Sequence, residues 1–131
     1  MDTYRALEAL GPEHEFAVVD ENLRAMSIVD KILKGLHGRI VNEVKFPKFT
    51  IGKEVQTHVL EFNSRKPFRS PKEFEETMQD AVSFILEHLR SKYDLFLLGS
   101  GMHPLLELSD TGIWPHRHRS IYKAYETVFN L

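Results

Sequence analysis

Glu13 and Glu15 lie two residues apart in the segment GPEHEF near the start of the chain. On a β-strand both carboxylates would project from one face, because side chains alternate between the two faces. Two like charges at this spacing repel, and a divalent cation such as Mg²⁺, which prefers oxygen ligands, is the usual remedy. A solvated strand face is the simpler alternative. The apolar run Phe16 to Val19 weakens that alternative, because it indicates a buried central strand.

A second pair of carboxylates, Glu54 and Glu61, is seven residues apart in KEVQTHVLEFNS. Glu61 stands between two large apolar residues in a run typical of a strand, where an unpaired carboxylate would be costly. A salt bridge to Arg65 or Lys66 would satisfy it, and so would a metal ion or a substrate. The sequence leaves these possibilities open.

A glycine-containing loop, LGSGMHP, follows a short apolar run and carries His103. Its glycines would allow a sharp turn and a close approach of the backbone to a ligand. The loop would deliver His103 to the carboxyl end of a buried strand, where site residues are common. A tight turn with an incidental histidine is the alternative, because the loop lacks the Lys-Ser/Thr ending of a phosphate-binding P-loop.

The segment WPHRHR contributes Arg117 and Arg119, whose guanidinium groups are suited to phosphate or carboxylate groups. Its two histidines form an HxH pair, but no third ligand at a recognisable spacing supports a zinc site. A solvated loop is the alternative here.

The bulk properties predict one globular domain over residues 1–131. Apolar residues make up 42% and charged residues 27% of the chain, which is ordinary for a soluble protein. A net charge of −2 argues against a dedicated nucleic-acid binder, and the absence of cysteine excludes disulfides and thiolate chemistry. We find no signal peptide and no apolar run long enough for a membrane span, so a cytoplasmic protein is expected.

Three strands are predicted, at residues 16–19, 55–63 and 95–98, from their β-branched, aromatic and apolar composition. Residues 39–53 are predicted to be an irregular connection, because proline and glycine interrupt them.

Two long helices are predicted from apolar residues at helical spacing. The first is Ser27–Leu36, with Ser27 and Asp30 as a capping pair and Gly35 and Gly38 as the stop.

The second helix is Pro71–Arg90, with Ser70 as N-cap and Glu73 completing a capping box. A last amphipathic helix from about Arg119 reaches Leu131 without a stop signal, which predicts that the chain ends inside a larger fold. These elements indicate an α+β fold: a largely antiparallel sheet with both long helices packed on one face.

In their order, the segments GPEHEFAVVD, KEVQTHVLEFNS, LGSGMHP and RSIYKAYETVFN resemble the carboxylate–amine ligase branch of the glutamate–cysteine ligase superfamily. The fold of that superfamily is similar to that of glutamine synthetase, and the resemblance spans most of the chain. Family members are much longer, and strands from their second half supply further metal and nucleotide contacts. The resemblance therefore implies that the active site on this chain is incomplete.

The resemblance also implies a chemistry. A glutamate-like carboxylate would react with ATP to give an acyl phosphate, which the amine of an amino acid such as cysteine would then attack. Mg²⁺ or Mn²⁺ would be the cofactor. By the same resemblance, the metal ligands would be Glu13, Glu15 and Glu61.

The remaining implied roles concern substrate and catalysis. Glu54 would bind substrate or nucleotide, or join the cation cluster, and His103 would line the pocket. Arg117 or Arg119 with Tyr122 would lie near the phosphate region. A second copy or a missing carboxy-terminal part would complete the site, and exposed sheet edges would favour self-association.

Two other functions stay open. The chain would be a non-catalytic module that binds a small ligand or nucleotide while keeping the ligase fold, or, ranked last, a generic α+β domain with structural carboxylates. The sequence does not specify which carboxylate and which amine are joined.

Overall fold

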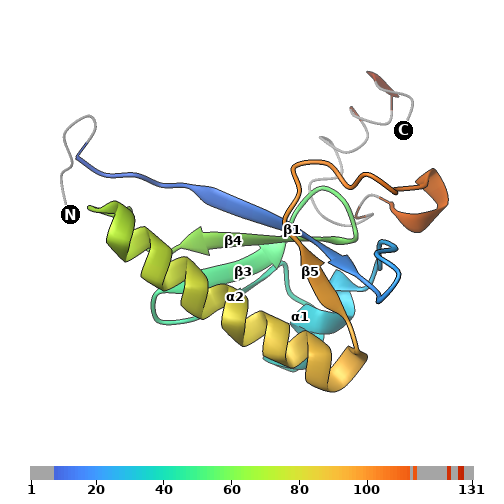
Figure 1. The fold of residues 1–131 in the computed structure, drawn as a ribbon, viewed down its shortest axis with the longest axis horizontal. Helices are drawn as coiled ribbons and strands as arrows, with labels where there is room; N and C mark the ends of the chain where they lie inside the picture. Colours follow the sequence, from blue (N-terminus) through green and yellow to red (C-terminus); the bar gives the residue numbers. More distant parts are fainter. Residues whose placement is uncertain (1–7, 113, 115–123, 125–126, 129–131) are drawn as a thin grey trace.

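The computed structural model of the chain describes residues 8–112, 114, 124 and 127–128. An antiparallel sheet with the strand order β2-β3-β4-β1-β5 forms its centre (Figure 1). The strands are β1 (Glu13–Val19), β2 (Glu43–Lys45), β3 (Phe49–Lys53), β4 (Val59–Ser64) and β5 (Phe96–Leu98). The helices are α1 (Val29–His37), α2 (Pro71–Tyr93) and a short 3₁₀ helix, η1 (Leu108–Asp110). The predicted α+β class with an antiparallel sheet is confirmed.

Both long helices cover the same side of the sheet, the lower side in Figure 1. Ile32 of α1 and Ile85 of α2 are fully buried in one core with Ile51, Leu60 and Phe62 of the sheet. Burial of each such side chain contributes about 1.5–3 kcal/mol, so this layer holds the fold together. The prediction of helices packed on one face is confirmed. None of the described helices is both long and apolar enough to cross a bilayer.

The prediction of an irregular connection over residues 39–53 is wrong, because β2 and β3 lie there. Pro47 occupies the turn between these two strands, and a hydrogen bond from Phe46 N to Phe49 O closes that turn at 2.9 Å. Gly52 lies within β3, where it pairs with Glu61 of β4. Proline and glycine therefore mark a hairpin here rather than a break in regular structure.

Helix α1 ends as predicted but begins differently. Gly38 adopts a left-handed conformation (φ 88°) at the C-cap, while Gly35 stays inside the helix. The predicted capping pair of Ser27 and Asp30 is wrong, because the helix starts without a side-chain cap. Ser27 Oγ donates instead to Asp110 O at 2.6 Å, so a distant loop binds the hydroxyl that the sequence assigned to a cap.

Helix α2 has the predicted capping box. Ser70 Oγ accepts from Glu73 N at 3.1 Å, and Glu73 Oε2 accepts from Arg69 N at 3.0 Å. The helix continues past the predicted end at Arg90 and stops where Asp94 adopts a left-handed conformation (φ 54°). Local signals alone thus fix the start of this helix.

Removing the cap of α2 tests this assignment. We expect Ser70→Ala to lower the free energy of unfolding by about 1 kcal/mol, because the backbone N–H of Glu73 loses its acceptor. Urea denaturation followed by circular dichroism measures the change. Ser83→Ala, at an exposed position within α2, is the matched control and should be nearly neutral. Equal effects of the two substitutions would contradict the capping assignment.

Candidate active site on the sheet face opposite the helices

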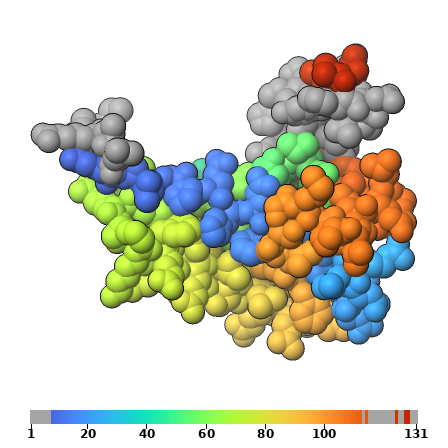
Figure 2. Space-filling view, turned by 45° about the horizontal axis from the view of Figure 1, so that its top comes forward, coloured from blue at the N-terminus to red at the C-terminus, as the bar shows by residue number. Residues whose placement is uncertain are grey.

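Glu13 and Glu15 project from the face of the sheet opposite the two helices. In the register of β1 with β4, Glu13 pairs with Asn63 and Glu15 with Glu61, and paired residues share a face. Their neighbours along β1 and β4 point into the core. β1 lies between β4 and β5, so the predicted central position of this strand is confirmed. Figure 2 looks toward this side and shows atoms of β1 at the surface beside the loop that follows β5.

We call Glu13, Glu15, Glu54 and Glu61 the carboxylate cluster. Glu54, directly after β3, shares a side-chain hydrogen bond with Glu61. Burial, this hydrogen bond and the charges of Glu54 and Glu13 raise the pKa of Glu61 from its ordinary 4.5 to about 7, although a hydrogen bond from Asn63 acts in the opposite direction. Glu61 therefore holds a proton far more readily than an isolated carboxyl group.

The pKa of Glu15 is also raised, first by partial withdrawal from water and then by the charges of Glu54 and Glu13. Among the described residues, no salt bridge includes a member of the carboxylate cluster. A salt bridge from Glu61 to Arg65 or Lys66 was one alternative, but Arg65 donates to Phe46 O at 3.4 Å instead. Within the part of the chain that the structure describes, the charges of Glu54 and Glu13 therefore act on Glu15 and Glu61.

The donor set of the cluster is suitable for a hard divalent cation, because such ions prefer several carboxylate oxygens. Within the described part of the chain, no three histidine, aspartate or glutamate side chains are arranged to hold a metal ion together. The strand register brings the carboxylates to one face, but their side chains do not converge on a common point. A metal site here requires the long glutamate side chains to rotate.

A cavity of about 210 Å³ opens next to the carboxylate cluster. Glu15 forms part of its wall, and the loop after β5 contributes Ser100 and His103. Gln56 and His58, which precede β4, complete the polar lining. The structure therefore brings two of the predicted site residues, Glu15 and His103, to one cavity.

His103 is buried, with 7% of its surface exposed. Its Nδ1 accepts the backbone N–H of Leu105 at 3.1 Å. A backbone N–H is always a donor, so the neutral ring must carry its proton on Nε2. Among the described residues, Nε2 is buried without a hydrogen-bond partner. His103 therefore presents an unused donor.

One glycine of this loop is required by packing. A Cβ at Gly99 would lie 3.1 Å from the Phe16 ring, so glycine lets the backbone approach this side chain. Gly101 has open space around its Cα and lies in the wall of the cavity. The predicted close approach of the backbone to a ligand stays a prediction for this loop.

His58 was not identified from the sequence as a site residue. It is 1% exposed, its Nδ1 lies 2.8 Å from Thr111 Oγ1, and its ring centre is 6.3 Å from that of His103. Burial and then the neighbouring His103 lower its pKa, while Asp110 acts in the opposite direction. The sequence did not indicate His58, because residues 55–58 were expected to be part of a strand. In the structure they precede β4 and form a turn.

A polar network fixes the loop that carries His103. Thr57 N donates to Gly112 O at 2.9 Å, and Gly112 N donates to Thr57 Oγ1 at 3.0 Å. The Thr57 hydroxyl donates in turn to Ser27, which binds Asp110, and Arg24 forms a salt bridge with Asp110 at 3.3 Å. Three segments distant in sequence are thereby joined beside the cavity.

Arg117, Arg119 and Tyr122 lie outside the described residues. Most of the segment predicted to form the last helix also lies outside them. Of the basic segment, Trp114 is described and is buried, 5% exposed. Lys53 Nζ lies 4.0 Å from the centre of its ring, a cation–π contact. At Trp114, therefore, the alternative of a solvated loop is wrong.

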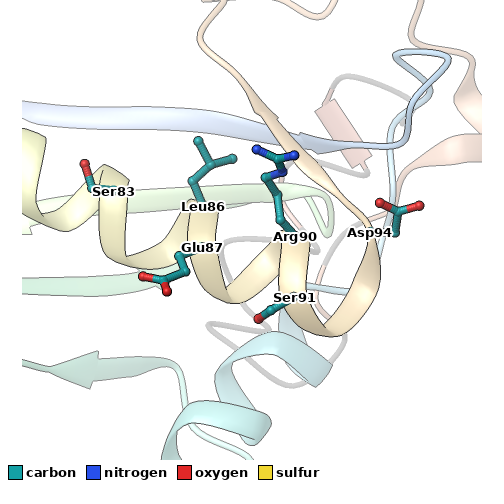
Figure 3. A pocket seen from close by; sticks show the side chains of 6 residues that line it. All are labelled: Ser83, Leu86, Glu87, Arg90, Ser91 and Asp94. Carbon is teal, nitrogen blue, oxygen red and sulfur yellow. The ribbon is translucent and has the colours of Figure 1, made fainter.

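A larger hollow, about 580 Å³, lies along α2 and away from the carboxylate cluster. Figure 3 shows that its side chains leave the helix in several directions rather than toward a common centre. Its one arginine, Arg90, lies over the Phe96 ring at 5.8 Å. This shallow groove lacks a group of converging polar atoms and is not the candidate site.

The sheet, its helices on one side and the cavity beside Glu15 on the other define an α+β domain with a candidate site on the face opposite the helices. Comparison with known proteins identifies the family. The model of Glutamate-cysteine ligase family 2 (GCS2) matches residues 9–130, so the chain belongs to this family.

A protein of Archaeoglobus fulgidus, described as uncharacterized, is 52% identical over 123 residues. The match covers 93% of this chain and 33% of the relative, so the chain spans about a third of that protein's length. No solved structure matches the chain.

The raised pKa of Glu61 makes stability depend on pH. Its folded-state pKa of about 7 exceeds its ordinary 4.5, so the stability it contributes is present below about pH 4.5 and is lost as pH rises through 7. We expect Glu61→Gln to be more stable than the wild type at about pH 8, by roughly 1 kcal/mol after allowance for solvent screening. The difference should shrink at about pH 5.

Thermal or urea unfolding at the two pH values, without divalent cations, measures this difference. Glu87→Gln on the exposed side of α2 is the control and should change stability little at either pH. If the stability of Glu61→Gln equals that of the wild type at every pH, repulsion within the carboxylate cluster does not destabilise the fold.

Proposed function

We propose that this chain is part of an ATP- and Mg²⁺-dependent ligase that joins a carboxylate to an amine through an acyl phosphate. The observation that carries the proposal is the carboxylate cluster, which the strand register gathers on the face of the sheet opposite the two helices. Membership of the glutamate–cysteine ligase family supports it. Because the chain spans about a third of its relative, the activity is proposed for a larger whole.

The reaction has two steps. A carboxylate oxygen attacks the γ-phosphorus of ATP, the bond to the β–γ bridging oxygen breaks, and ADP leaves. The amine then attacks the acyl carbon, phosphate leaves with the bonding pair, and the nitrogen loses a proton to give the amide. Both steps concentrate negative charge on phosphate oxygens, which is why such sites need cations and hydrogen-bond donors.

The residues would have three roles. Glu13, Glu15 and Glu61, with Glu54, would hold Mg²⁺, which when bound neutralises the charge of the phosphates. His103 would bind an oxygen of the reacting groups from the cavity next to Glu15. The basic residues Arg117 and Arg119 with Tyr122 would act near the phosphate groups. Parts of the larger protein, or a second copy, would complete the site.

The metal assignment is tested by nucleotide binding. We expect isothermal titration of MgATP to give measurable heat with the chain, and the Glu13→Ala/Glu15→Ala double variant to bind at least about tenfold more weakly. The reason is that the variant loses two of the carboxylates that would hold the cation. Mg²⁺ alone should raise the melting temperature of the wild type and not that of the variant.

The matched control is Glu75→Ala/Glu87→Ala, which removes the same charge from exposed positions on α2. It should bind MgATP like the wild type. Indistinguishable binding by all three proteins would refute the metal assignment. Binding without ADP release, when acids and amines are supplied to the larger protein, would indicate a nucleotide-binding module rather than a ligase.

A further inference from the structure

A second cavity, of about 380 Å³, lies against α2, the helix that covers the side of the sheet opposite the carboxylate cluster. Its walls come from the turn between β2 and β3, the loop between β4 and α2, and the first two turns of α2. The volume lies within the ~300–1,000 Å³ that is typical of pockets for small molecules. The candidate active site uses none of the residues that line it.

Three cationic side chains line this cavity, and we call them the cationic cluster: Lys48, Arg65 and Lys66. Arg65 N donates to Lys48 O at 3.0 Å, which joins the two segments that carry the cluster. Arg65 Nη1 also donates to Phe46 O at 3.4 Å, which restrains the guanidinium group. In the part of the chain that the structure describes, no salt bridge includes any of the three. Their charges therefore remain available to a ligand.

Two carboxylates also line the cavity, but both are engaged elsewhere. Glu73 Oε2 accepts from Arg69 N at 3.0 Å in the capping box, and Glu76 Oε1 lies 3.7 Å from Lys72 Nζ. They reduce the positive potential of the cavity without neutralising the cationic cluster. The whole chain has a net charge of −2, so this cluster is not part of a generally basic protein. Like charges gathered at one cavity repel, and a multiply charged anion relieves that repulsion.

The donors and the apolar part of the wall indicate the class of anion. A phosphate monoester group carries a charge of about −1.5 to −2 at pH 7 and three strong acceptor oxygens. Lysine ammonium groups and a guanidinium group are the side chains best suited to such oxygens. Pro47 and the buried Phe68 add apolar surface that inorganic phosphate would not use but an organic group would.

We propose that this cavity binds a small organic phosphate monoester, with the cationic cluster holding the phosphate group and with Pro47 and Phe68 contacting the organic part. The inference goes beyond the proposed function and does not depend on it. Neither Mg²⁺ nor ATP takes part, and the carboxylate cluster lies on the other side of the sheet.

The test is isothermal titration of the full chain with phenyl phosphate at about pH 8, where the second phosphate proton (pKa about 6) is lost, without Mg²⁺ or ATP. We expect binding, and we expect Lys48→Gln/Lys66→Gln to weaken it at least about tenfold, because two charge-assisted hydrogen bonds are lost. Phenyl sulfate has nearly the same shape and one charge fewer, and should bind wild type at least about fivefold more weakly. In ¹⁵N-labelled wild type, the amide resonances of Arg65 and Thr77 should shift as phenyl phosphate binds.

The matched control is Lys34→Gln/Lys92→Gln, which removes the same charge from exposed positions outside the cavity and should bind phenyl phosphate like the wild type. Circular dichroism melts establish that each variant is folded.

Three results would overturn the cavity assignment: no binding at millimolar concentration, equal binding by wild type and Lys48→Gln/Lys66→Gln, or equal binding of phenyl phosphate and phenyl sulfate. Inorganic phosphate that binds as tightly as phenyl phosphate would also overturn it, in favour of a site for the free ion. The Glu13→Ala/Glu15→Ala variant should bind phenyl phosphate like the wild type. Failure of the ligase proposal and failure of this inference are therefore distinguishable.

Discussion

The register between β1 and β4 is the constraint on which the site depends. The side of these strands that faces the helices carries Phe16, Leu60 and Phe62, and a slip of one residue would expose them and bury the carboxylates. The core therefore fixes the register, and the register places Glu15 directly opposite Glu61. Like charges directly opposite each other are destabilising. Packing on the helix side of the sheet therefore brings two carboxylates that repel each other together on the opposite side.

The face of the sheet opposite the helices has a cavity because distant segments are joined beside it. The hydroxyl of Thr57 and the carbonyl of Asp110 connect the turn before β4 to the end of the loop after β5, with Ser27 between them. His103 itself is oriented within its loop by Leu105 N. The sheet thus supplies the charged wall, and this network holds the loop that supplies the neutral donor.

What could be read from the sequence was local. The spacing of Glu13 and Glu15 and the capping box at Ser70 depend only on neighbours in the chain, and both appear as expected. The β2–β3 hairpin was missed because its turn residues interrupt short strands that gain stability only by pairing. Ser27 had two competing partners, its own helix and Asp110, and only tertiary structure decides between them. The position of His58 beside His103 also depends on tertiary structure, because a turn before β4 places it there.

The combination of a carboxylate cluster with a neutral histidine donor has a physical advantage over a site built from opposite charges. A lysine or arginine in the position of His103 would add a positive charge to the cavity that Glu15 lines, and would weaken the attraction of the carboxylates for a cation. A neutral imidazole whose Nδ1 is already engaged by the backbone can donate to an oxygen without competing for those carboxylates.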